Sequence, residues 1–196
     1  MPEFARLYEA IGMAFELHGK QQRKVSGVPY ISHLLAVAGL VMEFGGDEEV
    51  AIAAMLHDAV EDQGGHETLA KIRARFGDRV ADIVEGCSDA FEVPKPPWQE
   101  RKKAHLARLP AASADVRLVE AADKFHNLWT TIWNYVEDGP KVWARFRGGK
   151  DGTLWYYRKM TLLFMEHGPS LLGVELRALT SRLEEMMAAC GDDPVP

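Results

Sequence analysis

Helical periodicity extends over nearly the whole chain and is the feature that most restricts its fold. Near the N-terminus, apolar side chains recur every three or four residues, which is typical of an amphipathic helix. These side chains are Phe4, Leu7, Tyr8, Ile11 and Phe15. The alternating apolar and polar positions of a half-buried strand are nearly absent. We therefore predict an all-α protein.

Glycines, prolines and capping residues divide this pattern into separate helices. Asp47 and Asp78 are expected to cap two helices, and Pro29 to occupy the first helical position of another. The predicted helices cover residues 4–18, 29–44, 48–61, 67–76, 79–87, 98–109, 114–136, 153–166 and 170–189. A proline-rich loop is expected over residues 89–97, and a basic, glycine-rich connection over residues 146–152.

The chain has 196 residues and contains no repeat, low-complexity tract or linker that would divide it. This length is enough to bury a core without disulfides or metal ions. We therefore expect one domain over residues 1–190, followed by a flexible tail over residues 191–196.

The charge balance is acidic, with 29 Asp+Glu against 23 Lys+Arg and a net charge of -6. This argues against a general nucleic-acid binder, but it permits a small anionic ligand on a local basic patch. Cys87 and Cys190 form no close pair, so we expect no thiolate zinc site and a reducing, cytoplasmic environment. Neither a signal peptide nor a membrane span is expected, because no long apolar stretch is present.

The most informative motif is His57-Asp58, which lies in an otherwise apolar stretch. Charged groups are costly there unless they are paired or bound to a metal ion. Asp58, Glu61 and Asp62 are spaced i, i+3, i+4, so one helix face would carry three mutually repelling carboxylates. A cation would relieve that repulsion. A solvated helix C-terminus is the alternative, although acidic residues at that end oppose the helix dipole.

Two further segments supply polar residues in apolar surroundings. His33 lies on the first turn of a predicted helix, where a hydrogen-bonded core histidine is the alternative interpretation. Asp123, Asn127 and Thr130 are spaced i, i+4, i+7 and form one polar stripe. Two imidazoles and two carboxylates from three helices would suit a divalent first-row metal ion and leave positions for water and phosphate.

The order H…HD…D, at His33, His57-Asp58 and Asp123, resembles the HD-domain phosphohydrolase superfamily. The flanking sequences are more specific. QRKVSGVPYISH, HDAVED and DKFHNL, beginning at residues 22, 57 and 123, resemble motifs of the alarmone hydrolases. The chain is thus similar to the small, Mesh1-like alarmone hydrolases and to the hydrolase domain of RelA/SpoT proteins. This resemblance implies an HD-domain helical bundle.

The resemblance also implies one divalent metal ion, typically Mn²⁺, bound by four side chains. These would be His33, His57, Asp58 and Asp123. Glu61 would then act as the leading general base or water-positioning residue, with Asp62 in support. The implied reaction is hydrolysis of guanosine 3′,5′-bis(diphosphate), the alarmone (p)ppGpp of the stringent response, at the 3′ position. It would release pyrophosphate and GDP or GTP.

Two alternatives stay open at this point. One is an HD phosphohydrolase that acts on a related nucleotide, such as an adenosine alarmone or NADPH. Trp129 favours it, because the long-form enzymes often have Arg at that position. The other is a non-enzymatic alarmone-binding module, which the presence of both Glu61 and Asp62 argues against.

Four residues match substrate-binding positions of the family. Arg23 and Lys24 would contact the base and phosphate, and Asn127 and Thr130 the ribose and its surroundings. An exposed basic loop and a buried structural amide are the respective alternatives. One extra residue before Gly27, relative to many long forms, leaves the register of Arg23 and Lys24 open. No role is assigned to Arg145, Arg147, Lys150, Tyr156 and Tyr157.

The expected partner is a small-molecule nucleotide, with neither nucleic acid nor membrane. A homo-oligomer is compatible with the five tryptophans, which a packed core explains equally well.

Overall fold

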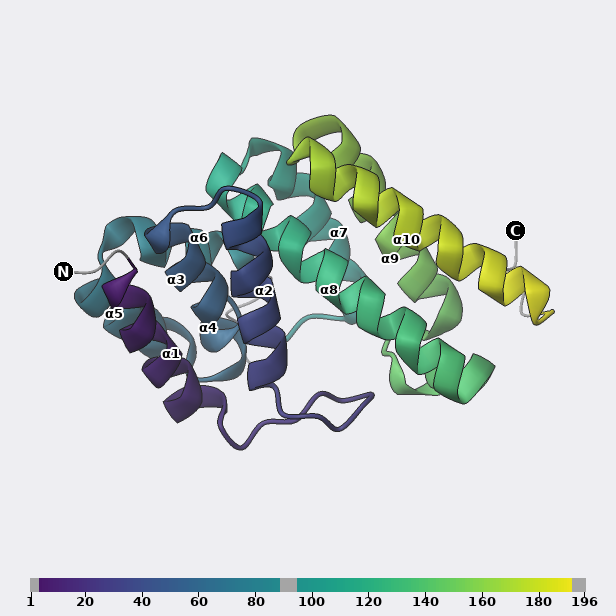
Figure 1. Ribbon diagram of the computed structural model, residues 1–196, viewed down its shortest axis with the longest axis horizontal. Coiled ribbons are helices and arrows are strands. Elements are labelled where there is room, and N and C mark those ends of the chain that lie inside the picture. Colours follow the sequence, from purple (N-terminus) through teal and green to yellow (C-terminus); the bar gives the residue numbers. More distant parts are fainter. Residues whose placement is uncertain (1–3, 89–94, 192–196) are drawn as a thin grey trace.

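The computed structural model describes residues 4–88 and 95–191, and it confirms the all-α prediction (Figure 1). Within these ranges the β-structure is one isolated bridge, between Gln22 and Pro29. The expected tail from residue 192 onward, and most of the proline-rich loop, lie outside the described residues. The α-helices are α1 (Ala5–His18), α2 (Ile31–Glu43), α3 (Glu48–Leu56), α4 (Ala59–Asp62), α5 (Gly65–Phe76), α6 (Asp78–Cys87), α7 (Trp98–Arg108), α8 (Ala114–Asp138), α9 (Gly149–His167) and α10 (Ser170–Ala189).

α3 forms the centre of the N-terminal half, where α1, α2 and α6 surround it. Its residues from Val50 to Leu56 are all buried, which explains why this helix shows no amphipathic pattern. Asp47 caps it as predicted, accepting a hydrogen bond of 3.1 Å from the Val50 amide.

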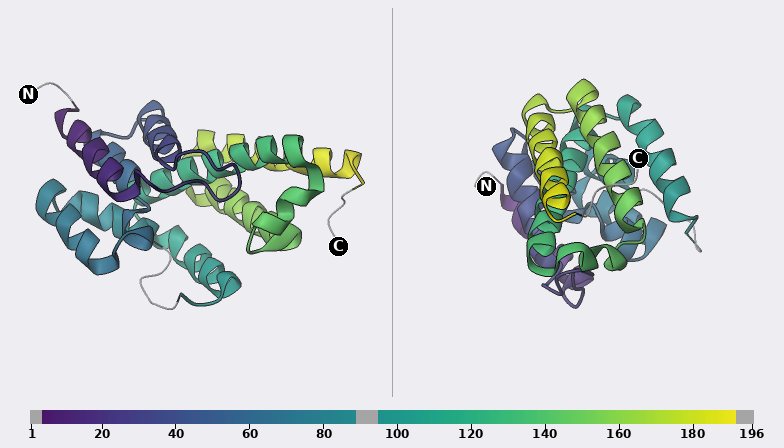
Figure 2. Two further views of the ribbon diagram at one scale, coloured as in Figure 1. Left: turned by 90° about the horizontal axis from the view of Figure 1, so that it is seen from below. Right: turned by 90° about the vertical axis from the view of Figure 1, so that its right-hand side faces the viewer.

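The 25-residue helix α8 connects the two halves of the molecule. α2 and α6 pack against it, and so do α9 and α10 in the C-terminal part (Figures 1 and 2). Because α8 passes through both halves, residues in its middle lie where the two halves meet. No helix in the described part of the chain is long and apolar enough to cross a membrane.

The predicted helix over residues 48–61 is wrong as a single element, because the helix is interrupted at His57 and Asp58. His57 Nδ1 lies 2.7 Å from the Ala54 carbonyl oxygen. In a continuous helix that oxygen would accept the Asp58 amide instead. The His57 side chain therefore competes with the backbone, and the turn places His57 and Asp58 between α3 and α4.

Three further details of the prediction need correction. Pro29 is not the first residue of a helix: it pairs with Gln22, and the Tyr30 amide donates to the Gln21 carbonyl oxygen at 2.9 Å, so α2 begins at Ile31. Asp78 is the first helical residue rather than the cap, because Gly77 at φ 95° precedes it. The predicted connection over residues 146–152 is partly helical, since α9 begins at Gly149. Residues 19–30, between α1 and α2, form a hairpin-like loop that the bridge between Gln22 and Pro29 closes.

Candidate functional site

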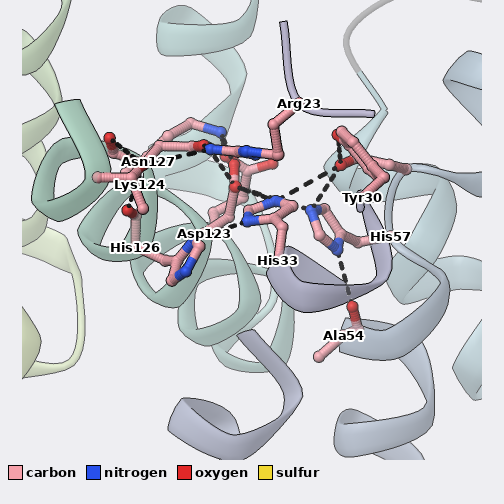
Figure 3. Close-up of polar contacts among 12 residues, drawn as sticks. Arg23, Tyr30, His33, Ala54, His57, Asp123, Lys124, His126 and Asn127 are labelled. Carbon is pink, nitrogen blue, oxygen red and sulfur yellow. Dashed lines mark hydrogen bonds and ion pairs between the residues drawn. The ribbon is translucent and has the colours of Figure 1, made fainter. Parts of the chain in front are cut away.

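Four polar side chains from three parts of the chain converge on one point, and Figure 3 labels three of them: His33, His57 and Asp123. His33 extends from the first turn of α2, His57 and Asp58 from the turn after α3, and Asp123 from α8. His33 Nε2 lies 3.1 Å from Asp123 Oδ1, and His57 Nε2 lies 3.1 Å from Asp58 Oδ2. The cross distances are both 3.7 Å. Ligand atoms of His33, His57 and Asp58 all lie within 4.8 Å of one another.

The hydrogen bonds of the two imidazoles direct both Nε2 atoms toward the carboxylates. His57 Nδ1 contacts a carbonyl oxygen, so this nitrogen carries the proton and donates it. His33 Nδ1 lies 2.8 Å from His126 Nδ1. Burial is the largest of the effects that lower the pKa of His126 to about 4. A neutral His126 can accept this hydrogen bond from His33, which leaves His33 Nε2 as an electron-pair donor.

The donor set fits a divalent metal ion. His33 Nε2 and His57 Nε2 are buried and have no hydrogen-bond partner among the described residues. Burial lowers the pKa of His57, but the carboxylates of Asp58 and Asp123 outweigh it and raise that pKa well above its ordinary value. The cluster therefore favours positive charge at the imidazole nitrogens, which a proton or a metal ion can supply. Two imidazoles and two carboxylates are suitable ligands for first-row divalent ions.

Both carboxylates are held from outside the cluster. Tyr30 donates its hydroxyl proton to Asp58 Oδ2 at 2.6 Å. The Lys124 ammonium contacts Asp123 Oδ2, and the Asn127 amide donates to Asp123 Oδ1. Burial raises the pKa of Asp123, but the charge of Lys124 and the two imidazoles outweigh it and hold the pKa well below its ordinary value. Asp123 is therefore ionised although it is buried.

A chain of buried polar groups continues behind Asp123. Lys124 Nζ lies 3.0 Å from Glu120 Oε2, and that same oxygen lies 2.9 Å from His105 Nε2. The sequence contains a signal for Glu120 and Lys124, which are spaced i, i+4 on α8. No sequence signal indicates His105, because it comes from α7 and meets Glu120 only through tertiary packing.

Glu61 and Asp62 line the same cavity as His57, Asp58 and Asp123, which has a volume of about 490 Å³. Lys95 Nζ lies 2.8 Å from Glu61 Oε1 and 4.0 Å from Asp62 Oδ1. Arg101, which is buried, lies 3.6 Å from Glu61 Oε1. The two carboxylates that we predict to be catalytic thus line one cavity with the His/Asp cluster, and they lie near two cations, Lys95 and Arg101.

The four predicted substrate-binding residues all line this cavity. Arg23 Nη2 donates to Asn127 Oδ1 at 2.7 Å and to Thr130 Oγ1 at 3.3 Å, and its guanidinium lies 5.7 Å from the centre of the Tyr30 ring. These contacts hold Arg23 at the cavity wall, unlike a residue of a freely exposed loop. Of the residues left without a role, four line the cavity: Arg145, Arg147, Tyr156 and Tyr157.

Trp129 is not among the residues that line the cavity. Its ring packs 6.0 Å from the His126 ring and 6.1 Å from the Trp133 ring, and its side chain is 42% exposed. The position of Trp129 therefore gives no support to the sequence argument that this residue favours a related nucleotide as substrate.

A family model described as the HD domain matches residues 10–154. The chain belongs to the HD-domain family. Hydrolases of this family are metal-dependent, and His33, His57 and Asp58 form a cluster that could hold a metal ion.

Two relatives of this HD-domain protein differ in how much of their own length the chain covers. It is 34% identical over 182 residues to the guanosine-3′,5′-bis(diphosphate) 3′-pyrophosphohydrolase MESH1 of Danio rerio, covering 85% of this chain and 97% of the relative. It is 40% identical over 124 residues, 62% of this chain, to a probable guanosine-3′,5′-bis(diphosphate) 3′-pyrophosphohydrolase of Synechocystis sp., but spans 16% of that longer protein.

A solved structure resembles the fold as a whole. It is described as a metazoan ortholog of SpoT that hydrolyzes ppGpp and plays a role in starvation responses. The TM-score is 0.75 at 25% identity, covering 91% of this chain and 96% of the other. The similarity therefore includes the C-terminal helices, where the motifs of the sequence are weakest.

Proposed function

We propose that this protein is a metal-dependent 3′-pyrophosphohydrolase of the guanosine alarmones. It would release pyrophosphate and GDP from guanosine 3′,5′-bis(diphosphate), and pyrophosphate and GTP from the form that carries a 5′-triphosphate. The observation that carries the proposal is the position of Glu61 and Asp62 in one cavity with His57, Asp58 and Asp123. Basic side chains that line the cavity, among them Arg23, Lys24, Arg145 and Arg147, form a basic wall that supports an anionic substrate. The names of the relatives support this particular nucleotide. We expect a cytoplasmic enzyme.

The metal ligands in this proposal are His33, His57, Asp58 and Asp123, and the ion is one Mn²⁺ per site. The geometry that supports them is the convergence of two Nε2 atoms and two carboxylates within 3.1–3.7 Å. When bound, such an ion supplies Lewis acidity and lowers the pKa of a water molecule.

Glu61 accepts the proton of the attacking water, and Asp62 orients that water. Lys95 and Arg101, near Glu61 Oε1, stabilise the negative charge of this carboxylate before substrate binds. Both cations also line the cavity, so they are available to bind the negatively charged phosphates. Tyr30 keeps Asp58 in place through its hydrogen bond of 2.6 Å.

Arg23 stacks its planar guanidinium on the purine, held in orientation by Asn127 and Thr130. Asn127 and Thr130 also lie where they can contact the ribose. Lys24 contacts phosphate, and Arg145 and Arg147 extend the basic wall toward a second phosphate group. A nucleotide with two separate diphosphates would use both parts of this wall.

The test is an assay of pyrophosphate release by metal-stripped protein to which Mn²⁺ is returned. The substrates are the guanosine alarmone, the adenosine alarmone and NADPH, compared as kcat/KM. We expect the guanosine alarmone to be preferred, and Asp58→Ala and Glu61→Gln to abolish turnover. Glu43→Gln, which changes an exposed carboxylate at the end of α2, is the matched control.

Binding of the alarmone without turnover by the unmodified protein would contradict the enzymatic proposal. Preference for the adenosine alarmone or NADPH would agree with the proposed type of reaction but would contradict the proposed substrate.

A further inference from the structure

We propose that Gln21 is a positioning residue that fixes the carboxylate of Asp62 for catalysis. The inference rests on the proposed function, because it assigns Gln21 a role through a carboxylate of that site. Gln21 lies in the loop after α1, and its Nε2 donates to Asp62 Oδ2 at 2.9 Å. The two residues are 41 positions apart, so only the fold brings them together.

The other atom of the Gln21 amide is bound from two sides. Its Oε1 lies 2.7 Å from His18 Nδ1 and accepts a hydrogen bond of 2.8 Å from Gln63 Nε2. An amide oxygen only accepts, so His18 Nδ1 must donate. These two donors leave one orientation of the amide, in which the NH₂ group faces Asp62.

The backbone of Gln21 is fixed as well. Its amide donates to the His18 carbonyl oxygen at 2.9 Å, and its carbonyl oxygen accepts from the Tyr30 amide at 2.9 Å. Every backbone and side-chain polar group of Gln21 therefore has a partner, although the side chain is only partly buried. A glutamine that served only as a polar surface residue would not need this degree of constraint.

His18 anchors the arrangement. Its side chain is fully buried, and its ring stacks on the Tyr30 ring at 5.5 Å with an interplanar angle of 20°. Tyr30 in turn holds Asp58. His18 and Gln21 thus connect the end of α1 with both sides of the site: Asp58 through Tyr30, and Asp62 through the amide.

Asp62 needs such support because α4 is a single turn of four residues. Lys95, at 4.0 Å from Asp62, is too distant to define the carboxylate's orientation by a hydrogen bond. Without Gln21 the Asp62 side chain could adopt other rotamers. Displacing a catalytic group by about 1 Å can cost about 100-fold in rate.

The experiment measures steady-state pyrophosphate release from the guanosine alarmone by Gln21→Ala, Asp62→Asn and the double variant. We expect Gln21→Ala to lower kcat by about 10-fold or more, with KM changed less than about 2-fold. In the Asp62→Asn background the same change should have almost no further effect, since Gln21 acts through Asp62. Gln99→Ala, an exposed glutamine on α7, is the control.

Gln21→Glu provides a second, nearly isosteric test. It retains an acceptor for His18 and Gln63 but places an oxygen against Asp62 Oδ2, so we expect a kcat loss at least as large as that of Gln21→Ala. Mn²⁺ affinity by calorimetry should match the unmodified protein in all Gln21 variants. Gln21→Ala should lower the melting temperature, because it leaves the buried His18 Nδ1 without its acceptor, whereas Gln21→Glu keeps that acceptor.

An equal kcat loss on the Asp62→Asn background, unchanged kcat in Gln21→Ala, or a loss explained by weaker Mn²⁺ binding would overturn the positioning role while leaving the proposed function in place. Absence of turnover by the unmodified protein would overturn the proposed function itself, and the role of Gln21 with it.

Discussion

The inward face of α8 is largely apolar but also buries several charged side chains, whereas its outward face exposes two tryptophans. Asp123 and Lys124 point inward and are buried as ions, whereas Trp129 and Trp133 are 42% and 53% exposed. Burying charge is costly unless it is paired or bound to a metal ion. Each buried charge on the inward face has a partner of opposite charge, which is typical of a functional polar site. Exposed tryptophans are common on protein surfaces and need no functional explanation by themselves.

The largest difference between the faces should appear on removal of a carboxylate from each. We expect Asp123→Ala to lower kcat for pyrophosphate release on the order of 10⁴-fold, as loss of an essential group of a catalytic unit does. Glu137→Ala, on the exposed part of the same helix, should leave kcat unchanged. Comparable activity of the two variants at saturating Mn²⁺ would remove the distinction between the faces.

Lys124→Met tests whether the inward ions depend on one another. It would leave Asp123 and Glu120 buried without their shared cation, so the free energy of unfolding should fall by about 3–5 kcal/mol. Urea denaturation measures this change. Lys124→Arg keeps the charge and should recover most of the stability; a neutral effect of Lys124→Met would show that the pairing is dispensable.

Stability at low pH should depend on Glu120. Burial raises the pKa of Glu120, but His105 and Lys124 outweigh it and lower that pKa from 4.5 to about 2. The folded pKa lies below the unfolded one, so the stabilisation is complete above pH 4.5 and is lost as the pH falls toward 2. This shift corresponds to about 3 kcal/mol. Urea denaturation between pH 6 and 3 should show a shallower pH dependence for Glu120→Gln, and identical slopes would contradict the assignment.

The smallest effect should come from the outward face. Because Trp133 keeps only about half of its surface buried, partly against the Trp129 ring, we expect Trp133→Ser to lower the free energy of unfolding by about 1–2 kcal/mol and to leave kcat unchanged. Sedimentation of both proteins adds a check on the oligomeric state. A larger loss of stability, or dissociation of a dimer, would show that this face is covered in solution.

Much of the fold could be predicted because local signals and packing agree. Helices such as α1, α6 and α10 are bounded by glycine, proline or polar caps, and their predicted bounds agree with the structure within one residue. The interruption at His57 could not be predicted from periodicity, since it depends on a side chain that contacts the Ala54 carbonyl oxygen.

The candidate site likewise has one part that the sequence predicts and one part that it does not. The motifs identify His33, His57, Asp58 and Asp123 as a group, and the structure brings these four together. The supporting contacts of His105 and Gln21 join residues far apart in the sequence, and neither follows a spacing rule. Such contacts arise from tertiary packing, which a single sequence does not display.

The most direct test of the account is a titration of metal-stripped protein with Mn²⁺ at saturating guanosine alarmone, recording pyrophosphate. We predict that release begins only when Mn²⁺ is added and reaches its maximum at one ion per chain, with Asp58→Ala silent throughout. Pyrophosphate release before Mn²⁺ is added, or none at any Mn²⁺ concentration, would contradict the proposal that this cluster binds the ion on which the reaction depends.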